Sequence, residues 1–213
     1  MSRPITIALA KGRILTDTLP LLARAGIEID EDVDTTRKLI IQSTAADIRL
    51  IFIRAADVPT YVQFGAADLG IVGKDVLMEH RDDALYELGD LKVAKCRMVV
   101  AEPGNLARQD NPQSWVRLRI ATKYVNTTRR HFARKGVQTE IIKLHGSMEL
   151  APLAGLADRI VDLVDTGDTM RANGLVEVEH IADISARLIA NKASIKMKRR
   201  LKEMVTTIAQ GAN

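Results

Sequence analysis

Apolar residues of this chain fall into short runs that alternate with segments of helical spacing. Residues 5–9 form one such run and are expected to be a buried strand. Leu15, Leu19 and Leu22 then recur on one face of a predicted helix, which Gly26 ends. Further strands are expected at residues 39–41, 48–53, 69–72, 119–122, 140–143 and 160–164, and further helices at residues 126–136 and 149–156. Strands that alternate with helices predict an α/β fold with mostly parallel sheets.

The C-terminal segment, residues 186–210, contains an amphipathic pattern. Its apolar residues, which include Met197, Leu201 and Met204, recur at helical spacing. The opposite face is basic and carries Lys196, Lys198, Arg199, Arg200 and Lys202. A solvated helix face explains this charge run more simply than a binding patch does.

The apolar run at residues 160–164 leads into a turn and a short helix that Gly174 can end. A strand that turns sharply into a helix directs several backbone N–H groups at one point, and the helix dipole adds positive potential there. The hydroxyl groups of Thr166 and Thr169 can donate hydrogen bonds to the same anion. The turn is therefore a candidate phosphate site.

Acidic residues accompany this candidate phosphate site. Asp162 and Asp165 flank the turn, where they can meet sugar hydroxyls or a magnesium ion. Two plainer explanations remain open, because Asp168 is also a suitable helix cap and a Thr-Gly pair after a strand is common. Phosphate binding beside carboxylates is the chemistry that a phosphosugar requires.

Composition narrows the class of protein. The 213 residues, of which 46% are hydrophobic, suffice for one large domain or two small α/β lobes. Aromatic residues make up 3%, which disfavours a module that stacks on nucleic-acid bases. The net charge of +4 fits an enzyme with polyanionic substrates, and it also fits weak nonspecific RNA binding.

The N-terminus and the cysteine content indicate a cytoplasmic protein. The first residues lack the apolar core of a signal peptide, and no apolar run approaches the length of a membrane span. Cys96 is the only cysteine, so no intrachain disulfide and no cysteine cluster for zinc can form.

One long motif, Asp162-Leu-Val-Asp-Thr-Gly-Asp-Thr-Met-Arg-Ala-Asn-Gly-Leu175, resembles the ATP phosphoribosyltransferase family. Other segments of the chain resemble the same family in the same order and spacing, so the resemblance covers essentially the whole sequence. These segments are residues 7–13, 50–59, 65–75, 119–124 with Asn126, 146–161 and 188–194, whereas Val125 stands where the family commonly has proline.

This resemblance implies a reaction and its partners. The enzymes join N1 of the adenine of ATP to C1 of 5-phosphoribosyl 1-pyrophosphate and release pyrophosphate, which is the first step of histidine biosynthesis. Mg²⁺ is expected with the substrate phosphates rather than in a protein-only metal site. The chain resembles the short, catalytic form, which works with a regulatory subunit similar to histidyl-tRNA synthetase; a homodimer within a hetero-oligomer is therefore expected.

The resemblance also implies an architecture. The family fold is two-lobed and similar to type II periplasmic binding proteins, with a ligand cleft between the lobes. Lobe I is expected to comprise residues 1–91 and 177–213, including the C-terminal helix. Lobe II is expected to comprise residues 92–176 and to carry the loop for 5-phosphoribosyl 1-pyrophosphate. Two chain crossings between the lobes permit hinge closure.

Site residues follow from the resemblance and from charge. The phosphoribosyl pyrophosphate site is expected at Asp162, Asp165, Thr166, Gly167, Asp168 and Thr169. Arg13 and Arg54, with Lys11 as a weaker third, are expected to stabilise the negative charge that grows on the leaving pyrophosphate. The competing explanation for each cation is solvation or a surface salt bridge.

The nucleotide is expected near Asp68, Gly70, Gly73 and Tyr124. A glycine lets a ligand approach the backbone closely, although core packing also explains Gly70. Tyr124 can stack on adenine, or it can simply pack. Glu149 is expected to contact magnesium or the ribose, and a carboxylate at a helix N-terminus is the rival explanation.

A second class of function remains open from the sequence. The same bilobed fold serves solute binders, so a nonenzymatic module that binds small anions is the alternative to the enzyme. A nucleic-acid binder that uses the basic tail is a third reading, and it would require salt-dependent retention of RNA.

Overall fold

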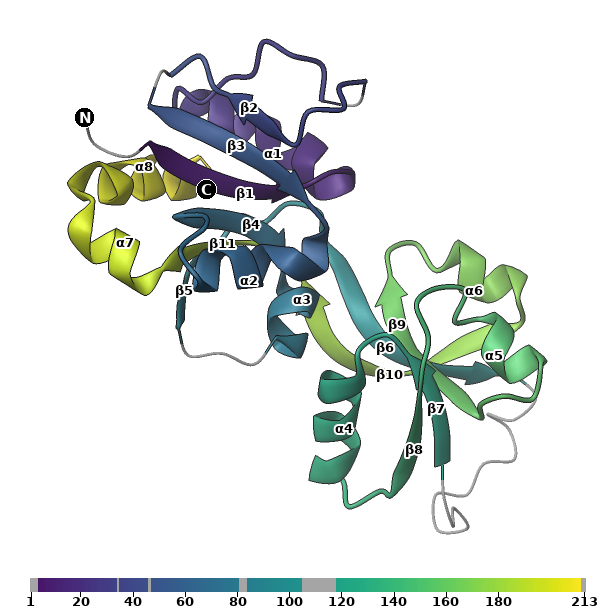
Figure 1. The fold of residues 1–213 in the computed structure, drawn as a ribbon. Coiled ribbons are helices and arrows are strands. Elements are labelled where there is room, and N and C mark those ends of the chain that lie inside the picture. The colour runs from purple at the N-terminus through teal and green to yellow at the C-terminus, as the bar shows by residue number, and fades with distance from the viewer. Residues whose placement is uncertain (1–3, 34, 46, 81–83, 105–117, 212–213) are drawn as a thin grey trace. The chain divides into compact units, whose positions relative to one another are not determined.

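The chain divides into two compact units. The computed structural model describes residues 4–33, 35–45, 47–80, 84–104 and 118–211. One unit comprises Met1–Lys95 and Ser185–Asn213, and the other comprises Cys96–Ile184. Figure 1 shows the elements of both units. Among the helices of the described residues, none is long and apolar enough to cross a membrane.

The first unit is built on a mixed sheet with the strand order β2-β3-β1-β4-β11-β5. Strands β3, β1 and β4 run parallel, while β2, β11 and β5 each run antiparallel to their neighbours. The strands are β1 (Ile5–Ala10), β2 (Ile40–Gln42), β3 (Ile48–Ile53), β4 (Leu69–Gly73), β5 (Leu85–Asp90) and β11 (Ala186–Asn191). The carboxyl ends of β1, β3 and β4 therefore lie at one edge of this sheet.

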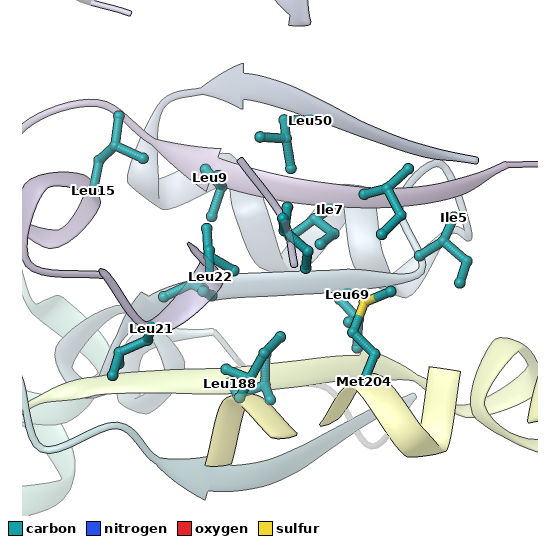
Figure 2. Close-up of a cluster of buried hydrophobic side chains, with 14 of the residues drawn as sticks. Ile5, Ile7, Leu9, Leu15, Leu21, Leu22, Leu50, Leu69, Leu188 and Met204 are labelled. Carbon is teal, nitrogen blue, oxygen red and sulfur yellow. The ribbon is translucent and has the colours of Figure 1, made fainter. Parts of the chain in front are cut away.

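Helices cover both faces of this sheet, which explains why β1 is apolar at every position. Successive side chains of a strand point to opposite faces. Ile7 and Leu9 pack with residues of α1 and α8, whereas Ala8 and Ala10 pack with residues of α2. Figure 2 shows the first of these two clusters. The helical elements are α1 (Arg13–Arg24), η1 (Ala55–Asp57), α2 (Val58–Gln63), α3 (Lys74–Glu79), α7 (Lys192–Met197) and α8 (Arg199–Gln210).

The second unit has its own mixed sheet, with the strand order β10-β6-β9-β7-β8. Strands β9, β7 and β8 run parallel, and β6 runs antiparallel to both of its neighbours. The elements are β6 (Cys96–Pro103), β7 (Leu118–Thr122), α4 (Val125–Arg134), β8 (Thr139–Lys143), α5 (Leu150–Leu153), β9 (Arg159–Val164), α6 (Asp168–Ala172) and β10 (Leu175–Ile184). A core that includes Val99, Ala121 and Ile160 lies within this unit.

The boundaries between the units differ from the expected lobe limits of 91/92 and 176/177. Strand β10 continues past Glu177 to Ile184 and pairs with β6 along this length, so residues 177–184 belong to the second unit. Residues 186–191, which the sequence placed in the amphipathic tail, form β11 between β4 and β5. The consecutive apolar residues Leu188, Ile189 and Ala190 are all buried, because both faces of that sheet are covered.

Candidate functional site

Basic residues follow the parallel strands of the first unit at the edge where these strands end. In open α/β sheets, ligands bind outside the carboxyl ends of the strands. Lys11 and Arg13 follow β1, Arg54 follows β3, and Gly73 ends β4. The structure therefore brings the three predicted cations to one edge of the first sheet.

The three cations differ in how firmly they are held. The ammonium of Lys11 donates hydrogen bonds to the carbonyl oxygens of Val33, at 2.6 Å, and Thr36, at 3.3 Å. The guanidinium of Arg13 lies 3.8 Å from the carboxylate of Asp17 and donates to a backbone carbonyl at 3.3 Å. Lys11 is thus tied to the backbone at Val33 and Thr36.

Of these three cations, Arg54 has the fewest partners within the described residues. It is exposed and has extended backbone geometry between β3 and η1. Within the part of the chain that the structure describes, its guanidinium has neither an ion pair nor a hydrogen bond. It lines an open pocket of about 520 Å³ together with Leu39, Phe52 and Asp57. A cation without a carboxylate partner keeps its charge available to an anionic ligand.

The two predicted nucleotide residues on β4, Gly70 and Gly73, each have a packing role in the structure. A side chain at Gly70 would place its Cβ 2.8 Å from methyl groups of both Val58 and Val62, so Gly70 allows α2 to pack on the sheet. A Cβ at Gly73 would collide with the carboxylate of Asp75, which occupies the space that the sequence assigned to a ligand. Packing therefore accounts for both glycines, and their contact with a nucleotide stays a prediction.

Asp68 also departs from its predicted role. It precedes β4, at the amino end of the strand rather than at the carboxyl edge, and its carboxylate is buried. One oxygen accepts hydrogen bonds from the backbone N–H of Thr6 and from the ammonium of Lys198, at 2.9 and 2.8 Å. The other accepts from the hydroxyl of Ser194 at 2.6 Å. Asp68 therefore ties β1 to the C-terminal helical segment.

Asp68→Asn should destabilise the protein by about 2 kcal/mol, because charged hydrogen bonds of this kind contribute roughly that much. Burial alone would raise the pKa of Asp68, but hydrogen bonds from Lys198, Ser194 and Thr6 outweigh it and lower the pKa. The stabilisation is therefore present above the carboxyl's unfolded pKa and is lost as pH falls through the folded pKa. Thermal unfolding across pH should show a Tm lower by roughly 5 °C at neutral pH and a smaller acid dependence.

The matched control for this prediction is Glu203→Gln, which removes a carboxylate from α8 that is exposed and only weakly paired. Its expected effect is within about 0.5 kcal/mol. Equal effects of the two substitutions would show that the hydrogen bonds of Asp68 contribute nothing specific.

The second unit collects its predicted site residues at the carboxyl edge of β7, β8 and β9. Lys123 and Tyr124 follow β7, and the turn that contains Asp165 follows β9. The segment after β8 leads to Glu149, which stands at the N-cap of α5. A backbone hydrogen bond joins two of these segments at this edge: the N–H of Leu144, which follows β8, donates to the carbonyl oxygen of Thr122, the last residue of β7, at 3.1 Å.

The loop between β9 and α6 is held by its own side chains. Gly167 has φ = 83°, a left-handed conformation that favours glycine. The hydroxyl of Thr166 donates to the carboxylate of Asp168 at 2.6 Å. Arg171 donates to the same carboxylate at 2.5 Å and to the carbonyl oxygen of Thr166 at 3.1 Å. The bonds from Thr166 and Arg171 lower the pKa of Asp168, so the carboxyl is ionised at neutral pH.

This pairing has a consequence for an incoming anion. The hydroxyl of Thr166 and the guanidinium of Arg171 are donors that a phosphate can use, and both are exposed. The Asp168 carboxylate accepts from both of them in this structure. Thr169 is exposed on the first turn of α6, beside these donors. Arg171 was not among the predicted residues, although its place on that helix could have indicated it.

Asp162 and Asp165 lie at different depths. Asp162 is half-buried on β9; its carboxylate accepts from the N–H of Leu163 at 2.8 Å and lies 3.8 Å from the ammonium of Lys123. Asp165 is exposed, and its carbonyl oxygen accepts from Arg97 at 2.9 Å. Arg97 could not be identified from the sequence, because only the pairing of β6 with β9 brings Arg97 opposite Val164.

Tyr124 is almost fully buried in the second unit. Its residue is 4% exposed, so the ring offers little surface to an adenine. The ammonium of Lys123 lies 4.9 Å from the centre of the ring, and the N–H of Tyr124 donates to the hydroxyl of Thr122 at 2.9 Å. The structure thus favours the packing alternative for Tyr124, and stacking on adenine stays a prediction.

The carboxylates fit a metal that substrate phosphates hold in part. Among the described residues, no group of three or more histidine, cysteine or acidic side chains is arranged to bind a metal ion by itself. Magnesium usually keeps several waters and takes one or two carboxylates together with phosphate oxygens. Asp162 and Asp165 beside a phosphate loop match that donor set.

The sequence matches a known family and close relatives. The family model for ATP phosphoribosyltransferase matches residues 54–210. An ATP phosphoribosyltransferase of Acidithiobacillus ferrooxidans is 62% identical over 94% of this chain and 93% of the relative. Another, of Nitrosococcus oceani, is 58% identical over 99% of this chain and 97% of the relative.

Solved structures agree with this match. A chain of the ATP phosphoribosyl transferase (HisG:HisZ) complex from Thermotoga maritima superposes with a TM-score of 0.82 at 32% identity, covering 98% of each chain. The VFT2 domain of BvgS from Bordetella pertussis superposes over 98% of this chain and 87% of the domain, with a TM-score of 0.57 at 11% identity. At this low identity, the similarity shows only that the two proteins share a two-lobed fold. At these identities and coverages, the chain belongs to the ATP phosphoribosyltransferase family, the pentosyltransferases that carry out the first step of histidine biosynthesis.

Proposed function

We propose that this chain transfers the phosphoribosyl group of 5-phosphoribosyl 1-pyrophosphate to N1 of ATP. The bond between N1 and the ribose C1 forms while the bond from C1 to the pyrophosphate oxygen breaks. The single observation that carries this assignment is the identity of about 60% to ATP phosphoribosyltransferases over nearly the whole chain. The polar loop after β9 and the cations after β1 and β3 supply the binding groups that this reaction needs.

The loop of residues 165–169 binds the 5-phosphate of the phosphosugar in this proposal. Gly167 opens the backbone for an anion, and Thr166 and Thr169 supply hydroxyl donors. Entry of the phosphate displaces the Asp168 carboxylate from Thr166 and Arg171. Asp168 then has carboxylate oxygens available for ribose hydroxyls, and Asp165 lies next to the loop.

Cationic side chains and a metal ion stabilise the leaving pyrophosphate. Members of this family act with a divalent metal, and we propose Mg²⁺. The ion supplies positive charge to the pyrophosphate. Asp162, Asp165 and Glu149 are the protein groups that would hold it or its waters. Arg54 adds a guanidinium that is free of other partners among the described residues, and Arg13 adds a second one that must first leave Asp17.

We further propose that the protein works as the catalytic subunit of a hetero-oligomer, with a homodimer of this chain inside it. The matched chain from Thermotoga maritima is part of a HisG:HisZ complex, and the two chains cover 98% of each other. A regulatory subunit similar to histidyl-tRNA synthetase is the expected partner. A cytoplasmic location is expected, because both substrates are highly charged phosphates that do not cross a membrane unaided.

A steady-state assay tests the proposed reaction. Purified protein, ATP, 5-phosphoribosyl 1-pyrophosphate and Mg²⁺ should release pyrophosphate and form a product with ribose on N1 of adenine, identified by mass spectrometry. Omission of either substrate should abolish pyrophosphate release. Tight binding of the phosphosugar without turnover, in the presence and absence of the regulatory subunit, would favour the nonenzymatic anion-binding module instead.

Feedback control is expected to require the second polypeptide. The isolated chain should be weakly active and insensitive to histidine, whereas addition of the synthetase-like subunit should raise kcat and confer inhibition by histidine. A regulator transmits such a signal only if it has different affinities for two conformations of the enzyme. Calorimetry that shows tight histidine binding to this chain alone, with matching inhibition, would contradict the expectation.

A further inference from the structure

The backbone is strained where the chain leaves the first unit. Lys92 and Ala94 have positive φ angles, 56° and 51°, although neither is a glycine. Such left-handed conformations are unfavourable for residues that carry a Cβ atom, and they persist where surrounding contacts hold them. Residues 91–95, which we call the exit segment, lead directly into β6 of the second unit. The contacts of the exit segment therefore decide how firmly the backbone is held at one of the two places where the chain passes between the units.

A carboxylate holds each of the two left-handed residues. The N–H of the first donates to Asp90 at 2.8 Å, and the N–H of the second donates to Asp17, on α1, at 3.1 Å. Asp90 has further partners, because it accepts from the hydroxyl of Ser185 at 2.7 Å and lies 3.1 Å from the guanidinium of Arg187. Within the described residues, the recorded partners of the Asp17 carboxylate are this N–H and the guanidinium of Arg13. Of the two carboxylates, Asp17 is therefore the one that can change partner more readily.

Arg13 contacts both Asp17 and the exit segment. Its Nε lies 3.8 Å from the carboxylate oxygen of Asp17 that accepts from Ala94. A second nitrogen of the guanidinium donates to the carbonyl oxygen of Lys95 at 3.3 Å. Both distances are long, and the side chains of Arg13 and Asp17 are 54% and 36% exposed, so these contacts are weak enough to be exchanged for an anionic ligand. Two contacts of the exit segment thus involve side chains of α1.

We propose that Asp17 is a positioning residue that couples Arg13 to the exit segment. Without an anion, Asp17 holds Arg13 against this segment. When pyrophosphate binds, Arg13 exchanges Asp17 and the carbonyl oxygen of Lys95 for the anion, and the exit segment loosens. This inference rests on the proposed contact of Arg13 with pyrophosphate. Because anion binding and loosening are linked, each favours the other to the same extent.

The charge of Asp17 opposes anion binding at Arg13. The carboxylate and the pyrophosphate compete for one guanidinium, so the free energy of the ion pair is lost when the anion binds. A partly exposed ion pair of this kind changes a binding constant by a factor of about 1.5 to 5. An effect of this size requires a test that separates competition for Arg13 from the general repulsion between two negative charges.

Calorimetry with inorganic pyrophosphate and Mg²⁺ provides that test. Asp17→Asn removes the charge but keeps an oxygen that can accept from the N–H of Ala94, and its Kd for pyrophosphate should be about threefold lower than that of the parent protein. In an Arg13→Ala background the same substitution should have no effect, because the guanidinium is absent. Asp17→Glu keeps the charge and should bring the Kd back toward the parental value.

Asp158→Asn is the matched control for Asp17→Asn. Asp158 is exposed to the same degree, and it too pairs with a guanidinium and accepts from a backbone N–H, both of Arg119. It lies in the second unit, at the amino end of β9, away from the carboxyl edge. The Kd of Asp158→Asn for pyrophosphate should equal that of the parent. A solely structural role of Asp17 would lower the melting temperature of Asp17→Asn and leave its pyrophosphate affinity unchanged.

Hydrogen exchange at the amide of Ala94 measures the other half of the coupling. In the parent protein, saturating pyrophosphate should speed this exchange by about the same threefold factor, as reciprocity requires. Asp17→Ala removes the acceptor of this N–H, so its exchange should be fast with and without pyrophosphate. An exchange rate in the parent protein that pyrophosphate leaves unchanged would contradict the coupling.

The outcomes separate this inference from the proposed reaction. Parental pyrophosphate affinity in Asp17→Asn, or an equal gain of affinity in the Arg13→Ala background, would overturn the coupling even if the transferase product is formed. If Arg13→Ala alone binds pyrophosphate as tightly as the parent does, Arg13 is not a pyrophosphate contact and the inference is wrong. The transfer reaction itself is judged separately, by formation of the N1-linked product.

Discussion

Arg54→Ala is expected to lower kcat/KM by about 100- to 1,000-fold, the effect of removing one preorganised charge contact to a transition state. The fold should be unaffected, because Arg54 is exposed and none of the ion pairs or hydrogen bonds recorded for the described residues involves its side chain. Pyrophosphate release at saturating and limiting substrate, together with the melting temperature, measures both expectations. Arg54→Lys should recover part of the activity, since it keeps the charge but loses the planar fork of donors.

Two further arginines serve as comparisons for Arg54. Arg199→Ala removes an arginine of α8 whose side chain is 94% exposed, and activity should stay at the parental level. Arg13→Ala should have an intermediate effect, because its guanidinium also holds Asp17 and a backbone carbonyl. Parental activity in both Arg13→Ala and Arg54→Ala would show that the pyrophosphate charge is neutralised elsewhere, for example by the metal ion alone.

Gly167→Val is expected to raise the KM for 5-phosphoribosyl 1-pyrophosphate by on the order of 100-fold. A valine in the left-handed conformation of the phosphate loop is strained by about 1–3 kcal/mol, so the loop should change its conformation and lose its contacts with the phosphate. The residue has φ = 83°, which a β-branched side chain rarely adopts. A Cβ there would also lie 2.9 Å from the guanidinium of Arg171 and displace it. Binding of the phosphosugar, followed by calorimetry, should weaken in parallel.

The control for this loop is Gly136→Val, at the end of α4. Gly136 has φ = 71°, but a Cβ would meet nothing within 4 Å. The two variants therefore share the same type of backbone penalty, and only Gly167→Val alters the proposed phosphate site. If Gly136→Val raises the KM for the phosphosugar as much as Gly167→Val does, the loop after β9 is not its binding site.

Local sequence pattern predicted those elements that are buried on both faces. The apolar runs of β1, β3 and β4 are visible because both sides of their sheet are covered, and the run of β9 is visible because most of its residues are buried. Strands β5 and β10 were not predicted. Both lie at the edge of a sheet and have one exposed face, so polar and apolar residues mix along them and leave no apolar run in the sequence. Their place depends on pairing with β11 and β6, which no local pattern encodes.

The candidate phosphate loop was also visible in the sequence, because its donors, its glycine and its acids are neighbours along the chain. Residues 165–169 are such a set, and hydrogen bonds between neighbours define their geometry. Asp68, Gly70 and Tyr124 belong to the opposite case. Each was assigned to a ligand, and each is buried in the structure: Asp68 accepts from the distant Lys198, and Gly70 packs against Val58 and Val62.

The sequence by itself therefore determined the family, the α/β class and the local chemistry of the loop after β9. Only the tertiary structure decided which polar side chains bind other parts of the protein and which remain available to a ligand. Lys11 is held by carbonyl oxygens from a segment more than 20 residues away, whereas Arg54 and Asp57 have no such partner recorded among the described residues. The pocket that joins Leu39 to Asp57 arises only when β2 pairs with β3. The physical reason is that burial and long-range hydrogen bonding depend on the whole folded sheet, while periodicity and turn chemistry depend on neighbours along the chain.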